Sequence, residues 1–126
     1  MAKKVIFVDD SATVLMSVDM ATEELVNSGI IEVETYSNPE EFLKDVQNGK
    51  SFDLLITDIN MPQMSGFDLA KNLRQTGIKQ PMLALTTENT SEMKMEGKKS
   101  GINGWVTKPF TANKVVMAIK RVLKIR

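Results

Sequence analysis

The sequence contains neither cysteine nor histidine among its 126 residues. Without cysteine the chain forms no disulfide, offers no thiol nucleophile and has no thiolate ligand for a metal. Without histidine it has neither a Ser-His catalytic triad nor a histidine zinc site. Any chemistry must therefore depend on carboxylates, hydroxyls, lysines or a hard cation held by oxygen atoms.

An excess of charge and a long apolar segment are also absent. The 16 basic residues balance the 16 acidic ones, giving a net charge of zero, so nothing predicts nucleic acid or an anionic membrane as a general partner. The chain has no stretch long enough to span a membrane and no signal-peptide pattern at its start. We therefore expect a cytoplasmic protein without membrane insertion, folded as one domain over residues 1–126.

Short apolar runs alternate with segments of helical periodicity along the whole chain. The expected strands are residues 4–8, 31–36, 54–57, 82–85 and 104–107. Between and after them we expect helices that begin after Ser11, that begin at Asn38-Pro39, that run from Phe67 towards Gly77, that span 89–100, and that close the chain. This alternation predicts an α/β fold in which helices cover both faces of a parallel sheet, with right-handed crossovers.

The side-chain patterns add detail to these elements. The first helix is expected to bury Val14, Leu15, Val18, Ala21, Leu25 and Val26, and the closing helix Val115, Val116, Ile119, Val122 and Leu123. Residues 31–36 alternate between apolar and polar, which favours a strand at the edge of the sheet. Residues 89–100 contain Gly97 and only Met93 and Met95 as large apolar residues, which indicates a weakly stabilised helix.

Residues 54–57 are apolar on both faces and lead directly into Asp58. Such a run suits the centre of a parallel sheet, and a carboxylate at its end lies at the edge where open α/β sheets bind ligands. Taken alone, Asp58 could simply cap the turn that Pro62 and Gly66 impose.

Other strand ends carry polar groups as well, at Asp9-Asp10, Thr86 and Lys108. In a parallel sheet these ends lie along one edge, so the side chains can converge. Three crowded carboxylates repel one another unless a cation holds them, and Mg²⁺ prefers such hard oxygen ligands. The pattern therefore predicts a magnesium site beside Asp58, which would act as a nucleophile and form an aspartyl phosphate.

Four motifs give this interpretation its specificity: Val8-Asp9-Asp10-Ser11, Thr57 to Pro62, Leu85 to Glu88, and Trp105 to Phe110. With them the chain resembles a receiver domain of two-component signalling, most of all the stand-alone chemotaxis response regulators. The resemblance covers essentially the whole chain. It implies a flavodoxin-like doubly wound sheet of five strands in the order 2-1-3-4-5 with five helices, a monomer, and no output domain.

The resemblance also assigns roles to individual residues. Asp58 matches the phospho-acceptor, Thr86 the switch hydroxyl and Lys108 the phosphate-binding lysine. For Mg²⁺, the matching ligands are Asp10 directly, Asp9 largely through water, Asp58, and the backbone carbonyl of Asn60. In the family the bond that matches Lys108-Pro109 is cis.

Two positions depart from the familiar pattern. Thr87 stands where alanine or glycine is common, and its bulk could hinder water that attacks the phosphoryl group. Trp105 stands where a tyrosine or phenylalanine switch residue is usual, although a packed core aromatic is the simpler interpretation. Asn60 and Glu88, each two positions after a site residue, match positions that tune the lifetime of the phosphoryl group.

The implied function is that of a response regulator, which is not a conventional enzyme. A histidine kinase would phosphorylate Asp58 and so change the face formed by the fourth helix, fifth strand and fifth helix. The implied output partner is a flagellar motor switch protein, with a phosphatase to end the signal. A phosphate sink and a receiver with a non-flagellar partner remain the alternatives.

Two other classes fit the residues poorly. A flavodoxin-like electron carrier would need a hydroxyl-rich phosphate loop where this chain has Asp9-Asp10. A haloacid-dehalogenase-type phosphatase would need an acid at the position of Ser11.

Overall fold

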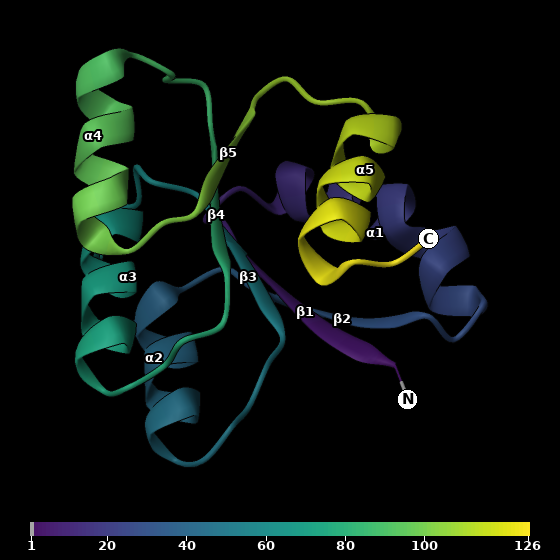
Figure 1. Ribbon diagram of the computed structural model, residues 1–126, viewed down its shortest axis with the longest axis horizontal. Coiled ribbons are helices and arrows are strands. Elements are labelled where there is room, and N and C mark those ends of the chain that lie inside the picture. The colour runs from purple at the N-terminus through teal and green to yellow at the C-terminus, as the bar shows by residue number, and fades with distance from the viewer. Residues whose placement is uncertain (1) are drawn as a thin grey trace.

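The computed structural model describes residues 2–126 and confirms the predicted fold class. The strands β1 (Lys3–Val8), β2 (Ile31–Tyr36), β3 (Leu54–Thr57), β4 (Met82–Thr86) and β5 (Gly104–Thr107) form one parallel sheet in the order β2-β1-β3-β4-β5. The helices are α1 (Ala12–Asn27), α2 (Pro39–Gln47), α3 (Gly66–Gln75), α4 (Ser91–Ser100) and α5 (Ala112–Leu123). Helices α1 and α5 cover one face of the sheet, and α2, α3 and α4 cover the other (Figure 1).

The sheet divides the hydrophobic core into two clusters. One cluster lies under α2, α3 and α4 and contains Phe42, Leu55 and Leu73; the other lies under α1 and α5 and contains Phe7, Ile56 and Ile119. Strands β3 and β4 are buried along their whole length. Their side chains alternate between the two clusters, which explains why these strands are apolar on both faces.

Every helix begins with a side-chain cap on the edge where the strands end. The hydroxyl or amide oxygen of the capping residue accepts a hydrogen bond from a backbone N–H of the first turn; the caps are Ser11, Asn38, Ser65, Thr90 and Thr111. Such a cap typically stabilises a helix by about 1 kcal/mol. These caps fix the loops of this edge, which also carry the polar residues singled out above.

The structure corrects one detail of the predicted burial. Val26, expected on the buried side of α1, is 39% exposed, because it lies in the last turn at the margin of the stripe formed by the buried residues Val18, Thr22 and Leu25. Met95 is 61% exposed and contributes nothing to the core. Helix α4 begins at Ser91. Its buried residues are Gly97 and Ser100, and Met93 is partly buried against the core, which is consistent with the thin apolar side expected from the sequence.

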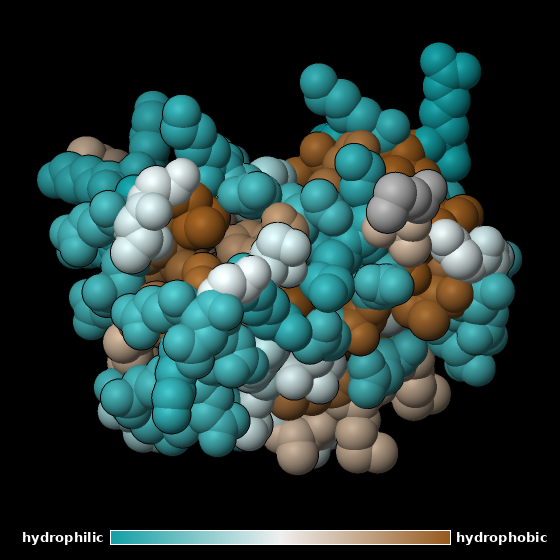
Figure 2. Space-filling model, turned by 90° about the horizontal axis from the view of Figure 1, so that it is seen from below, coloured by the Kyte–Doolittle hydropathy of each residue, from teal (hydrophilic) through white to brown (hydrophobic). Residues whose placement is uncertain are grey.

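The face of the molecule drawn in Figure 2, which is seen from below relative to Figure 1, has no large continuous apolar region. Apolar atoms there are separated by hydrophilic side chains (Figure 2). Among residues 2–126, no helix is both long and apolar enough to cross a membrane.

Candidate functional site

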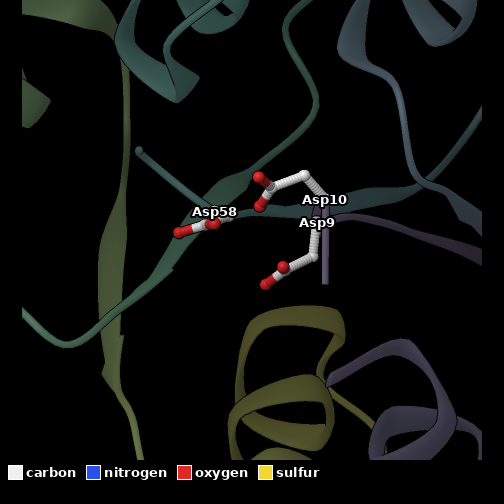
Figure 3. A group of neighbouring side chains, drawn as sticks. All are labelled: Asp9, Asp10 and Asp58. Atoms are coloured by element: carbon white, nitrogen blue, oxygen red, sulfur yellow. The ribbon is translucent and has the colours of Figure 1, made fainter. Parts of the chain in front are cut away.

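The ends of β1 and β3 bring three carboxyl groups together. These neighbouring strands are in register, Val8 with Thr57, so Asp9-Asp10 and Asp58 follow at the same edge. One carboxylate oxygen from each residue lies within 4.8 Å of the others. Figure 3 shows the three side chains meeting there, Asp9 and Asp10 from the end of β1 and Asp58 from the end of β3. The predicted convergence of these acids is confirmed.

Asp9 is held by hydrogen bonds at both of its oxygens. It is only 1% exposed, its Oδ1 accepts the backbone N–H of Ser11 at 2.9 Å, and its Oδ2 accepts a hydrogen bond from Lys108 Nζ at 2.7 Å. The same Nζ lies 3.6 Å from Asp58 Oδ1. Lys108 therefore reaches the acidic cluster from the end of β5, as predicted. The Lys108-Pro109 bond that follows it is cis.

Asp58 holds a proton more tightly than an ordinary aspartate does. It is 7% exposed, and burial together with the nearby charge of Asp9 raises its pKa from 3.8 to about 6, although Lys108 acts in the opposite direction. Its Oδ1 accepts the backbone N–H of Ile59 at 2.8 Å. No group in the described part of the chain donates a hydrogen bond to Oδ2, so this oxygen is free to react.

The donor set fits a hard divalent cation. Three carboxylates crowd one edge, and Asp10 is exposed and forms no ion pair within residues 2–126. Repulsion from Asp9 and Asp10 is part of what raises the pKa of Asp58. A cation among these oxygens would relieve that repulsion, and Mg²⁺ accepts such ligands while keeping several waters.

Glu88 forms hydrogen bonds with three of the predicted site residues. The sequence did not reveal these hydrogen bonds. Its Oε1 accepts a hydrogen bond from Asn60 Nδ2 at 2.7 Å, and its backbone carbonyl accepts the indole N–H of Trp105 at 2.8 Å. Its own backbone N–H donates to Thr86 Oγ1 at 3.3 Å. One residue of the β4–α4 loop thus joins the loop after β3, the end of β4 and the aromatic side chain of β5.

Trp105 packs against α4 through a glycine. A Cβ atom on Gly97 would lie 2.8 Å from Trp105 Cζ3, and the indole ring is 6.4 Å from the ring of Phe67, centroid to centroid. The absence of a side chain at Gly97 therefore leaves the space that the indole ring occupies. The sequence had indicated only that this glycine weakens the helix. Thr86, at the end of β4, is 1% exposed, whereas Thr87 is exposed to solvent.

Gly66 is a second glycine that allows two parts of the chain to approach closely. From the sequence alone we expected it only to help form a turn. A Cβ atom there would collide with the backbone carbonyl of Asp58. The Gly66 N–H donates to the carbonyl of Ile59 at 2.9 Å, which closes the loop after β3. This tight loop fixes the backbone that carries Asp58.

Comparison with known proteins places this site in a family context. A profile described as the response regulator receiver domain matches residues 5–120. The chemotaxis protein CheY of Pseudomonas aeruginosa is 30% identical over 123 residues, which cover 96% of each chain. The crystal structure of the chemotaxis response regulator CheY4 of Vibrio cholerae superposes with a TM-score of 0.85 at 40% identity, covering 97% of this chain and 99% of that one.

Other relatives are longer than this chain. The alkaline phosphatase synthesis transcriptional regulatory protein PhoP of Bacillus subtilis is 33% identical over 124 residues, which cover 98% of this chain but 50% of PhoP. The chain therefore spans about half the length of the first curated relatives that it matches.

Proposed function

The chain belongs to the response regulator receiver family, and from this premise we propose that it accepts a phosphoryl group on Asp58 from a cognate histidine kinase. As a receiver domain it is a phospho-accepting switch and not a conventional enzyme. The main support for Asp58 as the acceptor is its geometry: a nearly buried carboxylate with one oxygen unpaired, facing two further acids and a lysine.

The proposed reaction uses the unpaired oxygen of Asp58. Asp58 Oδ2 attacks the phosphorus of the kinase phosphohistidine; an O–P bond forms, the P–N bond breaks, and the electron pair leaves with the imidazole. With its pKa raised to about 6, Asp58 is still mostly ionised at neutral pH and so can act as the nucleophile. The Lys108 ammonium lies beside it to bind a phosphoryl oxygen.

Mg²⁺ is the proposed cofactor, with Asp9, Asp10, Asp58 and the backbone carbonyl of Asn60 as its protein ligands. When bound it would neutralise charge on the phosphoryl oxygens and on the three carboxylates. Because both oxygens of Asp9 are already hydrogen-bonded, we assign direct contact to Asp10 and a water-mediated contact to Asp9.

The signal would pass from Asp58 through Glu88 to the surface. Thr86 Oγ1 accepts a hydrogen bond from the Glu88 N–H, so its own proton is available to donate to a phosphoryl oxygen. A shift of Thr86 would move Glu88, whose carbonyl holds the Trp105 indole. Trp105 belongs to β5 and packs against α4, so we propose that the α4-β5-α5 face reads out phosphorylation.

We further propose chemotaxis as the pathway. The support is that the match to chemotaxis regulators extends over nearly the full length of both chains. The corresponding partners are a flagellar motor switch protein and a phosphatase, acting on a cytoplasmic monomer. A phosphate sink or a receiver with a non-flagellar partner is the second candidate, favoured by the transcriptional relatives that share only their receiver half.

The acceptor assignment is tested by labelling with a phosphodonor in the presence of Mg²⁺. The wild-type chain should acquire an acid-stable, base-labile phosphoryl group, and Asp58→Asn should abolish it. Asp19→Asn, an exposed acid on α1, is the matched control and should label normally. Undiminished labelling of Asp58→Asn would overturn the assignment.

A further inference from the structure

The two edge strands of the sheet differ in how they are protected. At one edge, β2 carries Glu32 and Glu34, and Glu34 forms ion pairs with Lys50 at 2.7 Å and Lys4 at 3.6 Å. At the other edge, β5 consists of Gly104-Trp105-Val106-Thr107 and has no charged side chain. Charges on an edge strand discourage pairing with another chain. Only the β5 edge lacks them.

The outer side of β5 has backbone groups available for pairing. The Lys108 N–H, directly after β5, donates inward to the Thr86 carbonyl at 2.8 Å, and β5 pairs with β4 alone. In a parallel ladder, alternate residues direct their N–H and C=O groups to the same neighbour. Gly104 and Val106 therefore direct theirs towards β4, as Lys108 does, whereas Trp105 and Thr107 direct theirs outward, away from the sheet.

Two hollows flank this edge, and both are lined by cations. The hollow on the α4 side has a volume of about 880 Å³ and includes Lys79, Lys94 and Lys98; the hollow on the α5 side has about 340 Å³ and includes Lys114 and Arg121. No acidic residue lines either hollow. Within residues 2–126, none of these five cations forms an ion pair.

We propose that the β5 edge docks an extended, acidic segment of a partner protein, which adds to the sheet as a sixth strand. Backbone hydrogen bonds to Trp105 and Thr107 would give affinity, and acidic side chains entering the flanking hollows would give specificity. A second copy of this chain fits poorly, because the same five cations would face one another.

This inference rests on the proposed function, since it names the class of partner for the same output face. Trp105 lines both hollows, so its position decides their shape on either side of the edge. Docking would therefore respond to the state of Asp58 through Thr86 and Glu88.

The test uses a fluorescein-labelled peptide of alternating glutamate and valine, eight residues long and blocked at its C-terminus. Its anisotropy is titrated with the full chain in Mg²⁺ and beryllofluoride, which mimics the acyl phosphate. We expect saturable binding, with slowed hydrogen exchange at the Trp105 and Thr107 amides. A peptide with lysine in place of glutamate should not bind. A glutamate peptide N-methylated at alternate residues keeps its side chains but loses one hydrogen-bonding edge, and should bind at least about tenfold more weakly.

A charge reversal on α4 provides the matched protein variant. Lys98→Glu changes a hollow-lining residue and should weaken binding of the glutamate peptide severalfold. Lys99→Glu makes the same charge change one residue away, outside both hollows, and should leave binding unchanged. Equal effects of the two variants would show attraction by overall charge and would overturn the docking site.

The outcomes separate this inference from the proposed function. Equal peptide binding with and without beryllofluoride would refute the phosphorylation switch while leaving strand addition intact. Binding that requires beryllofluoride but tolerates N-methylation would refute strand addition while leaving the switch intact. A dimer whose β5 amides are protected and which the peptide fails to displace would show that a second copy covers the edge, which also overturns the proposal.

Discussion

Asn60 and Glu88, which lie 28 positions apart in the sequence, are joined by a hydrogen bond of 2.7 Å from Asn60 Nδ2 to Glu88 Oε1. The bond connects the loop after β3 to the loop after β4 at the exposed rim of the acidic cluster. Water that hydrolyses an acyl phosphate on Asp58 must pass this rim. The two residues are therefore one structural unit, although the sequence presents them as two separate tuning positions.

A double-mutant cycle tests that unit. Asn60→Ala and Glu88→Ala should each speed dephosphorylation of Asp58, by roughly two- to tenfold, because either change opens the rim to water. Both substitutions remove the same hydrogen bond. The increase in dephosphorylation rate in the double variant should therefore be smaller than the product of the increases in the two single variants. The rates are measured as loss of phosphoryl label. Strictly multiplicative effects would show that the hydrogen bond has no role in the lifetime.

The raised pKa of Asp58 predicts a pH-dependent stability in metal-free buffer. A carboxyl whose pKa is about 6 in the folded chain, against 3.8 for an unperturbed aspartate, holds its proton more tightly when folded. Its ionisation therefore lowers the free energy of unfolding as the pH rises from about 4 through 6. Asp58→Asn should stabilise the chain by about 2–3 kcal/mol near neutral pH, and the gain should shrink as the pH falls towards 4.

Chemical denaturation in EDTA across this pH range measures the effect. Asp19→Asn is the control and should show no such pH-dependent gain, since Asp19 is exposed. Adding Mg²⁺ should stabilise the wild-type chain more than Asp58→Asn, because the variant lacks one ligand. If Asp58→Asn were less stable than wild type near neutral pH, repulsion among the three carboxylates would not be destabilising the metal-free chain.

Lys108 should stabilise the fold as well as bind phosphate. Its ammonium is the ion-pair partner of Asp9, which is only 1% exposed. Lys108→Ala would leave that buried carboxylate without its partner, so we expect a loss of roughly 2–4 kcal/mol in metal-free buffer. Lys99→Ala, an exposed lysine without an ion pair, should cost little. Adding Mg²⁺ should restore part of the unfolding free energy that Lys108→Ala loses, because the cation would compensate the charge of Asp9. If it restores none, the cation does not interact with Asp9.

Gly97→Ala should displace the only tryptophan. The added methyl group would lie 2.8 Å from Trp105 Cζ3, closer than packed carbon atoms tolerate, so the ring must move away from α4. We expect a red-shifted emission of Trp105 and stronger quenching by acrylamide. Glu92→Ala, on the exposed side of α4, is the control. Unchanged emission in Gly97→Ala would mean that α4 shifts and the ring does not.

Most of the fold could be predicted because its signals are local. Apolar runs such as residues 54–57 and capping residues such as Ser11 act through neighbours in the chain, and the topology then brings Asp9, Asp10 and Asp58 together. The order of the strands came from resemblance and was confirmed. The exposure of Val26 could not be predicted, because periodicity places Val26 beside the buried Leu25 but does not show how wide the covered stripe of α1 is.

The links within the site could not be predicted for a related reason. The carbonyl of Glu88 and the indole of Trp105 are 17 positions apart, and a backbone carbonyl leaves no trace in residue identity. The closeness of Gly97 to Trp105 and of Gly66 to Asp58 likewise depends on packing distances of a few tenths of an ångström. A glycine in the sequence indicates a turn or a close approach equally well.

The division of the core by the sheet has a mechanical consequence. Trp105 packs with the cluster under α2, α3 and α4, whereas its neighbour Val106 packs with the cluster under α1 and α5. In helix α4 only Gly97 and Ser100 are fully buried, and Met93 is partly buried against the core, so the helix can be displaced without opening the opposite layer. The layer of α4 can then move while the layer of α1 and α5 stays rigid. Strand β5 contributes one residue to each layer, so it is the element at which a moving layer adjoins a rigid one.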